Sequence, residues 1–358
     1  MIVGSTMFSF KNVSLLTASA ALVLLVLTGG CSPESGRSSD PEIGPDHLEI
    51  ALQYDVGKRY LFEFDMSYET DFGEALGNLL PEGQRATQTQ QFSVGVLEAT
   101  PSGGRKLEFE FLETRFDIDM GGVKASFNSQ DQIKEGDPFA DMYAGLTQAM
   151  GHPISVELDA DLQVVSTDGI EGLRQQVLSN ANPQLEAMVQ GMFSESYIAN
   201  LTRPSGIPER PVQPGDSWPL EITQDLGALG RFVTDQQYQF KNLENHQDTE
   251  CALMTFSGTV KGGSKAESEG MSQMMEITGG KTSGKMWYDP RVGQFIDASA
   301  EQDLKMRMAV PGIPAEAMQG GGLMLEVRQT MRRRLVRVDD IGASDETQSP
   351  PESGTEGP

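Results

Sequence analysis

The stretch Tyr60-Leu61-Phe62-Glu63-Phe64-Asp65-Met66-Ser67-Tyr68-Glu69 decides the fold of this chain. Aromatic side chains and one methionine occupy every second position, and mostly polar side chains occupy the positions between them. Successive side chains of a β-strand point to opposite faces of its sheet, so this period of two predicts a strand. The sheet that contains it is expected to have one apolar face and one mostly polar face.

Strand patterns of this kind dominate the region from residue 48 to residue 338. The pattern from Leu107 to Met120 changes phase after Leu112, which predicts a β-bulge. Apolar residues at helical spacing predict helices near residues 171–178 and 183–193, and a weaker pattern predicts one within 137–150. Further strands are predicted at residues 92–96, 218–222, 232–240, 251–260, 285–288, 295–310 and 323–338.

The two halves of this region resemble each other. Gly57-Lys58-Arg59-Tyr60 opens the first half, Gly215-Asp216-Ser217-Trp218 opens the second, and a glutamine-rich strand follows each. We therefore expect an α+β fold that is mostly antiparallel β. It would consist of two duplicated curved sheets or half-barrels joined by a helical segment. The expected units are an N-terminal β-rich half with helices over residues 48–200 and a C-terminal β-rich half over residues 201–338.

The first 31 residues have the pattern of an export signal. Lys11 precedes an uncharged apolar run from Val13 to Leu27, and small residues lead from there to Cys31. The run is shorter than the roughly 20 residues of a membrane-spanning helix, so a cleaved secretory signal is the better interpretation.

A cysteine directly after small residues resembles the lipobox of bacterial lipoproteins, although Leu27 lies four residues before Cys31 and the usual spacing is three. The resemblance implies that residues 1–30 are a lipoprotein signal peptide and that Cys31 is lipidated. The membrane would then be a partner through this lipid anchor, and the protein would face the periplasm or the exterior of a bacterial cell.

Two flanking segments have the composition of unfolded chain. Residues 31–47 are rich in Ser, Pro, Gly and acidic residues and predict a flexible tether, and residues 339–358 predict a disordered acidic tail. The formal net charge of the chain is −25, which disfavours binding to nucleic acid and to anionic membrane surfaces.

One motif in the middle of the chain carries a family resemblance. The segment from Pro211 to Trp218 reads Pro-Val-Gln-Pro-Gly-Asp-Ser-Trp, and it follows a hairpin with acidic residues over 156–164. Together with the opening at Gly57, these features resemble an uncharacterised family of bacterial secreted lipoproteins, domain of unknown function 6263. That family has no assigned activity, so the resemblance implies topology and compartment alone. A looser likeness is to periplasmic lipoprotein carriers, whose curved sheet closed by helices holds acyl chains.

The chain contains no nucleophile elbow, phosphate-binding loop, dinucleotide fingerprint or zinc-protease motif. Cys251 lies in a strand-like context without an electropositive neighbourhood, so we interpret it as a small buried residue and not as a reactive thiol. The histidines and the acidic pairs lack the spacing of metal ligands, so we expect no metal site and no cofactor. These residues are His47, His152, His246, Asp117, Asp119, Asp159 and Asp161.

Two other features of the sequence have ligand binding as one of their possible interpretations. The first is a basic cluster near the C-terminal end of the last strand, which is either a patch for an anion or lipid headgroup, or an edge strand whose charges pair with acids. The second is a set of methionines, which either line an adaptable apolar cavity or fill an ordinary core. The cluster comprises Arg328, Arg332, Arg333, Arg334 and Arg337. The methionines include Met188, Met192, Met271, Met274, Met275, Met306, Met308, Met318, Met324 and Met331.

The leading hypothesis from the sequence is a membrane-tethered envelope lipoprotein that is not an enzyme. Its folded part would bind a hydrophobic ligand or an envelope protein, with residues 268–280 and 310–323 as candidate flaps over the apolar face of the sheet. One alternative is a structural envelope scaffold without a small ligand, and a second is a carboxylate-dependent hydrolase.

Overall fold

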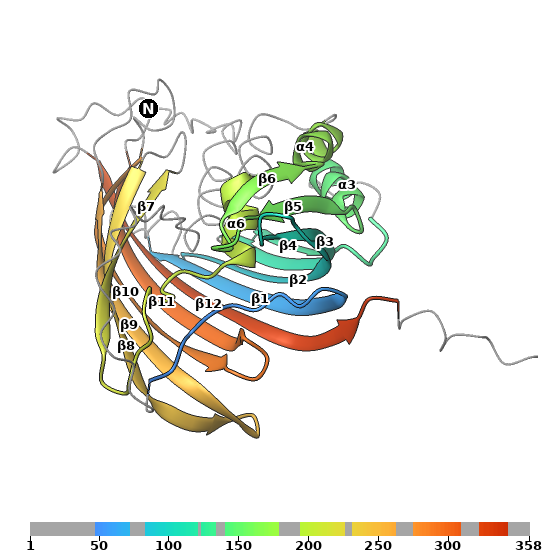
Figure 1. The fold of residues 1–358 in the computed structure, drawn as a ribbon. Coiled ribbons are helices and arrows are strands. Elements are labelled where there is room, and N and C mark those ends of the chain that lie inside the picture. Colours follow the sequence, from blue (N-terminus) through green and yellow to red (C-terminus); the bar gives the residue numbers. More distant parts are fainter. Residues whose placement is uncertain are drawn as a thin grey trace, which may run out of the picture.

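A computed structural model describes residues 47–71, 83–120, 123–133, 140–178, 194–225, 231–262, 275–308 and 322–342 (Figure 1). Most of these residues belong to one open, 12-stranded antiparallel sheet. Its strands are β1 (Lys58–Asp71), β2 (Gln84–Ala99), β3 (Arg105–Met120), β4 (Val123–Asn128), β5 (Ile154–Leu158), β6 (Val164–Asp168), β7 (Ser217–Asp225), β8 (Arg231–His246), β9 (Thr249–Gly262), β10 (Met275–Asp289), β11 (Gln294–Met308) and β12 (Leu323–Asp340). The described helices are α3 (Ala140–Ala149), α4 (Ile170–Leu178) and α6 (Glu195–Thr202).

The strand order shows how the chain builds a single sheet. The order is β6-β5-β3-β2-β1-β12-β11-β10-β9-β8-β7, and β4 pairs with β3. The first half of the chain therefore extends the sheet from β1 to one edge. The second half begins at the opposite edge with β7 and returns to β12, whose residues from Glu326 to Asp340 pair with the whole of β1.

The expectation of an α+β fold with two duplicated sheets joined by a helical segment is wrong. The strands of both halves lie in one sheet, because the pairing of β1 with β12 joins them. Two separate sheets would each leave an exposed edge at β1 and β12, and unpaired strand edges attract further strands. Pairing these two edges with each other removes both.

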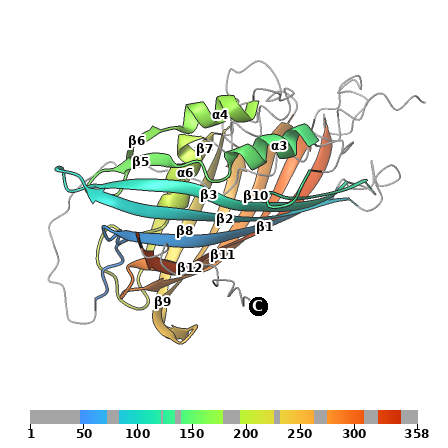
Figure 2. The same ribbon diagram turned by 90° about the vertical axis from the view of Figure 1, so that its right-hand side faces the viewer.

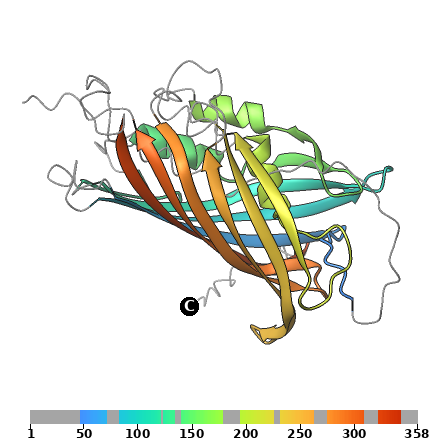
Figure 3. The same ribbon diagram turned by 90° about the vertical axis from the view of Figure 1, so that its left-hand side faces the viewer.

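All the described helices lie on the same side of the sheet (Figures 1, 2 and 3). The sheet is strongly twisted, as strand sterics require, so that β1, β2 and β3 cross the direction of β8, β9 and β10 (Figures 2 and 3). We call the helix-bearing side the inner face, which carries Phe62, Phe64 and Met66, and the other side the outer face, which carries Glu63 and Asp65.

The period of two in β1 is confirmed. Tyr60, Phe62, Phe64, Met66 and Tyr68 are all buried on the inner face. An aromatic stack continues from Phe62 across β2 and β3, with ring centroids 5.2 Å apart for the first pair and 5.1 Å for the second. Contacts of this kind stabilise a sheet by about 0.5–1.5 kcal/mol each beyond the burial of their area. The members of the stack are Phe62, Phe92 and Phe109.

The predicted β-bulge is also confirmed. Gln91 lies opposite Glu113, whereas the next residue, Phe92, lies opposite Phe111, so Leu112 is the extra residue of β3. The bulge changes which residues face inward. Residues before it continue the aromatic stack, and Phe116 after it packs against the α3 residue Tyr143, with ring centroids 5.5 Å apart.

The predicted helices near 137–150 and 171–178 correspond to α3 and α4. The predicted helix over 183–193 lies outside the described residues. So do Cys31, most of the tether and acidic tail, and most of both candidate flaps. No helix among the described ranges has the length and apolar character needed to cross a membrane.

Candidate functional site

Hydrogen bonds hold helix α6 in place at both of its ends, to β2 at one end and to the segment before β1 at the other. At its N-terminus the Ser194 hydroxyl accepts a hydrogen bond from the Tyr197 backbone N–H at 3.1 Å, which caps the helix. The Tyr197 hydroxyl donates to Gln90 Oε1 of β2 at 2.9 Å. At the C-terminus the Tyr54 hydroxyl donates to the carbonyl of Thr202. Tyr197, Ile198 and Leu201 are buried, so α6 presents one apolar side to the sheet.

A cavity of about 120 Å³ lies between α6 and the inner face, and the described residues enclose it only in part. Helix α6 contributes Tyr197 and Leu201, and Pro204 and Ser205 follow from the segment after it. The sheet residues come from both halves of the chain: Phe64, Met66, Ile222, Thr234, Gln236, Tyr238, Phe256, Thr282, Met286, Ala298, Ser299, Ala300, Gln302, Met331, Arg332 and Arg333.

The walls of this cavity are mostly apolar and adaptable. Tyr238 and Phe256 stack with ring centroids 5.1 Å apart. Met66, Met286 and Met331 line the same cavity, and all five side chains are nearly inaccessible to solvent. Methionine side chains are flexible and polarisable and adapt to irregular shapes. Met331 is one of the methionines for which the sequence left two alternatives open, a cavity lining or an ordinary core, and it lines the cavity together with Met66 and Met286.

Polar side chains cross this apolar surface in one row. Cross-strand pairing places Gln236, Thr282, Gln302 and Gln329 in register on β8, β10, β11 and β12, with Gly258 of β9 between the first two. These four polar side chains are buried. The Gln302 Oε1 atom accepts no hydrogen bond from the described residues. Polar groups without partners are costly in an apolar interior, so this oxygen is a candidate to receive a ligand donor or a water molecule.

Among the described residues, Arg333 is the one buried cationic residue, and 8% of it is exposed to solvent. Its Nη2 donates to the carbonyl of Leu201 at 3.2 Å, near the C-terminus of α6. Its guanidinium carbon lies 4.0 Å from the centroid of the Phe62 ring. The Nε and Nη1 atoms have no hydrogen-bond partner among the described residues. Burial lowers the pKa of Arg333 to about 10, so the side chain is still cationic at neutral pH.

The other members of the basic cluster pair with acidic residues. Arg328 lies 3.1 Å from Asp303, Arg332 lies 2.6 Å from Asp297, and Arg334 contacts Glu63. Pairing with acids is therefore confirmed for these arginines. The expectation that they belong to an edge strand is wrong, because β12 lies between β1 and β11 in the middle of the sheet. The non-local pairing of β1 with β12 could not be inferred from the charges.

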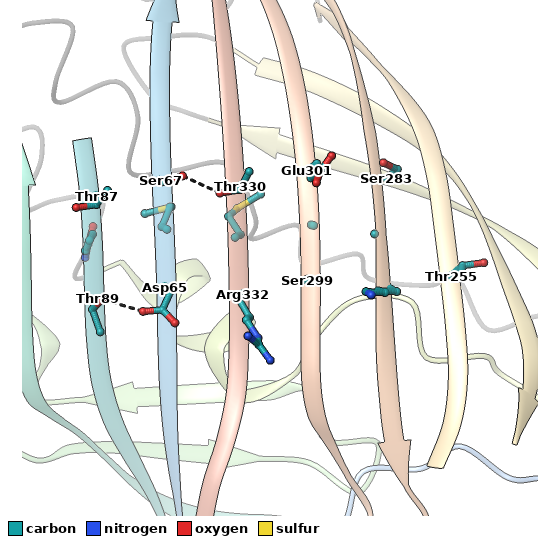
Figure 4. A pocket seen from close by; sticks show the side chains of 16 residues that line it. Asp65, Ser67, Thr87, Thr89, Thr255, Ser283, Ser299, Glu301, Thr330 and Arg332 are labelled. Carbon is teal, nitrogen blue, oxygen red and sulfur yellow. Dashed lines mark hydrogen bonds between the residues drawn. The ribbon is translucent and has the colours of Figure 1, made fainter. Parts of the chain in front are cut away.

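The outer face carries a broad hollow of about 660 Å³ (Figure 4). Its labelled side chains are mainly hydroxyl-bearing and charged, and several bond to one another: Ser67 contacts Thr330 at 2.7 Å, and Thr89 donates to Asp65 at 2.8 Å. The labelled side chains belong to the polar face that the β1 pattern predicts, so we interpret the hollow as a solvated part of that face.

An ionic cluster on the outer face joins β8, β11 and β12. Arg332 donates two hydrogen bonds to Asp297, and His246 Nε2 lies 3.2 Å from Asp297 Oδ2. The His246 ring stacks on Trp287, with centroids 4.1 Å apart. Burial raises the pKa of Asp297, but the hydrogen bonds and charges of Arg332 and His246 outweigh burial and hold that pKa below its usual value.

Two further candidates from the sequence, Cys251 and Asp159, have structural roles. Cys251 is buried in β9, and burial raises its pKa to about 11, so the thiol is protonated at neutral pH. Asp159 Oδ1 accepts hydrogen bonds from the backbone of Asp161 and Gln163 in the turn between β5 and β6. Within the described ranges, no group of three or more His, Cys, Asp or Glu side chains is arranged to hold a metal ion.

One signal for the inner-face site was present in the sequence. The buried glutamines occupy the same parity as the apolar residues of their strands, as Gln90 does beside Phe92 in β2. A polar residue at a position of core parity predicts a buried polar group that needs a partner. The same alternation applies to the arginines of β12. Arg333 occupies a position that faces the core, whereas Arg332 and Arg334 occupy positions that face outward.

No curated protein matches the chain. Lipovitellin, from a study of lipid–protein interactions, is 12% identical over 83% of this chain with a TM-score of 0.40, and the chain spans 27% of the length of that structure. A Bacteroides fragilis protein described as exported is 12% identical, with 82% of this chain and 100% of that chain covered and a TM-score of 0.27. Neither likeness is close enough to carry an argument about function.

A family model gives the informative match. The model described as a family of unknown function, DUF6263, matches residues 103–293, from the beginning of β3 to the turn after β10. The motif from Pro211 to Trp218 lies within this range, in agreement with the resemblance that it carries in the sequence. Because the match covers more than half of the chain, the protein belongs to the DUF6263 family of unknown function.

Proposed function

We propose that the protein is a lipid-anchored envelope protein that binds a hydrophobic molecule between α6 and the inner face, without catalysing a reaction. The observation that carries this proposal is the cavity under α6, which is lined by aromatic and methionine side chains of both halves of the chain. Largely apolar pockets with a few polar groups are typical of small-molecule binding sites. The pattern of residues 1–31 supports the anchor and the location outside the cytoplasm.

The size of the cavity indicates how a ligand would enter. A cavity of about 150 Å³ accommodates a benzene-sized molecule, and pockets for larger ligands are typically about 300–1,000 Å³. At about 120 Å³ the cavity admits part of a hydrocarbon chain while α6 stays in place. A larger ligand would extend through the part that the described residues leave open, or would displace α6 from the sheet.

A neutral fluorescent probe tests this proposal. We expect purified protein to increase the fluorescence of N-phenyl-1-naphthylamine with saturable binding. Replacing Ala300 with Phe should abolish this binding, because Ala300 lines the cavity and a phenyl ring would fill it. The matched control is Glu301→Phe, which adds the same ring to the next residue of β11, an exposed position on the outer face.

Two results would overturn the proposal. The first is no saturable binding of the probe by the wild-type protein, and the second is equal binding by the Ala300→Phe variant and the wild type. If the Ala300→Phe variant does not fold, Met331→Ala replaces it. That change enlarges the cavity, so it should alter the affinity for the probe if the cavity is the binding site.

A further inference from the structure

We propose that the ligand of this cavity is an anionic amphiphile, such as a fatty acid, whose carboxylate pairs with Arg333 while its hydrocarbon chain lies on the methionine and aromatic residues. This inference rests on the proposed function and adds the chemical class of the ligand. The observation that carries it is a buried guanidinium in the cavity wall with two nitrogen atoms that lack hydrogen-bond partners among the described residues.

The charge of Arg333 is not balanced by a carboxylate of the described residues. Tyr54 is the one other titratable group that acts on its pKa, and burial raises the pKa of Tyr54 to about 12, so this hydroxyl is neutral at neutral pH. The neighbouring Arg332 and Arg334 each contact a carboxylate on the outer face. Among these three consecutive arginines of β12, the buried one is therefore the one without an acidic partner in the part of the chain that the structure describes.

The chemistry of the side chain indicates its partner. A guanidinium carries five N–H donors in a planar arrangement that matches a carboxylate or phosphate. Within the described residues Arg333 donates one hydrogen bond, to the carbonyl of Leu201, and its guanidinium stacks on Phe62. Those contacts compensate a buried cation only in part, because the loss of hydration requires both charge pairing and hydrogen bonds. An anionic headgroup would supply both to Nε and Nη1.

The same cavity offers an apolar path that begins at this charge. Arg333 lies on β12, and the path continues across β11 and β10 to Phe256 on β9, Tyr238 on β8 and Ile222 on β7. Adjacent strands are about 4.8 Å apart, so β12 and β8 are separated by about 19 Å along the sheet. One charged end and a mostly apolar surface fit a molecule with a single headgroup and a chain, and the cavity of about 120 Å³ takes part of that chain while α6 stays in place.

The test compares an acid with its own ester. Dansyl-undecanoic acid and its methyl ester have the same chain and fluorophore and differ in the headgroup charge. We expect the wild-type protein to bind the acid at least tenfold more tightly than the ester. Arg333→Met should bind both with the affinity of the ester, because it retains the length of the side chain and loses its charge. Arg328→Met, a change on the outer face of the same strand, should behave like the wild type.

The outcomes separate this inference from the proposed function. Equal binding of acid and ester by wild-type protein that binds N-phenyl-1-naphthylamine would overturn the headgroup assignment and leave the proposed function standing. No binding of any of the three probes would overturn both. Displacement of the acid by inorganic phosphate or acetate at equal concentration would assign Arg333 to a soluble anion and overturn the amphiphile. The acid–ester comparison in the wild type needs no variant and stays decisive if Arg333→Met fails to fold.

Discussion

At the scale of single residues, the neighbours Arg332 and Arg333 lie in different environments, one on the outer face of the sheet and one in its buried inner face. Successive side chains of a strand alternate between faces, so Arg333 is buried under α6 while Arg332 pairs with Asp297 on the outer face. The same charge therefore has different energetic consequences at the two positions. Near α6 it lacks an acidic partner among the described residues, and on the outer face it has one.

The isolated charge of Arg333 predicts an unusual stability effect. We expect Arg333→Met to raise the free energy of unfolding of the ligand-free protein by about 1 kcal/mol. The variant loses a hydrogen bond and a cation–π contact. It also no longer buries a cation that lacks a carboxylate partner among the described residues, and burial of an unpaired cation costs several kcal/mol. Urea denaturation measures the change, and Arg328→Met should differ from the wild type by less than about 0.5 kcal/mol. A loss of stability in Arg333→Met would show that the charge is fully compensated within the protein.

The ionic cluster around Asp297 predicts a pH dependence. The folded-state pKa of Asp297 is held below its usual value, so its stabilising contribution is present above about pH 4, the pKa of an unfolded aspartate. That contribution is lost as the pH falls through the lower folded-state pKa. We expect Asp297→Asn to reduce the free energy of unfolding by about 1–3 kcal/mol at pH 7 and to weaken its dependence on pH below pH 4.

Urea denaturation at several pH values checks this dependence. Asp303→Asn is the matched control, because its partner Arg328 is an exposed residue and the pair lies on the same outer face. The control should change stability by less than about 1 kcal/mol at any pH. An equal effect of the two variants would contradict a special role for the buried carboxylate.

At the scale of elements, periodicity predicted strands and helices well where the signal is local. The alternation in β1, the bulge in β3 and the helices α3 and α4 all follow from neighbours within a few residues. Helix α6 was not delimited, although the cap at Ser194 is a recognisable start signal. Its place on the sheet depends on contacts with Gln90 and Arg333, which are distant in sequence and leave no local pattern.

The bulge in β3 leads to a test of register. Deleting Leu112 would force either the residues before it or those after it onto the wrong face, because a shift of one residue inverts every side chain. We expect the deletion to lower the free energy of unfolding by about 3 kcal/mol or more, comparable to the loss of a buried aromatic residue. Leu112→Ala keeps the extra residue and should cost about 1 kcal/mol. Urea denaturation of both variants distinguishes them, and similar stabilities would show that the bulge does not set the register.

At the scale of the whole molecule, the likeness of the two halves led the fold prediction in the wrong direction. Each half contains a plausible set of antiparallel strands, and nothing local marks β1 and β12 as partners. The cavity also depends on the pairing of β1 with β12, because its walls combine Phe64 of the first half with Tyr238 and Met331 of the second. A candidate site of this kind is invisible until the long-range pairing is known. The sequence shows the glutamines and methionines that line the site, but it does not show how they are arranged in space.

The anchor is the remaining property of the whole molecule that the sequence predicts, and it has a direct test. Cys31 lies outside the described residues, so the prediction depends on the sequence pattern alone. Bacteria that express the wild type should incorporate labelled palmitate into the protein and retain it with the membrane fraction. We expect Cys31→Ser to lose the label completely and to leave the membrane fraction, because a serine has no thiol to form the thioether of a lipid anchor. Cys251→Ala is the matched control, since the chain has two cysteines and Cys251 is buried in β9. A labelled Cys31→Ser variant, or an unlabelled wild type, would rule out the anchor.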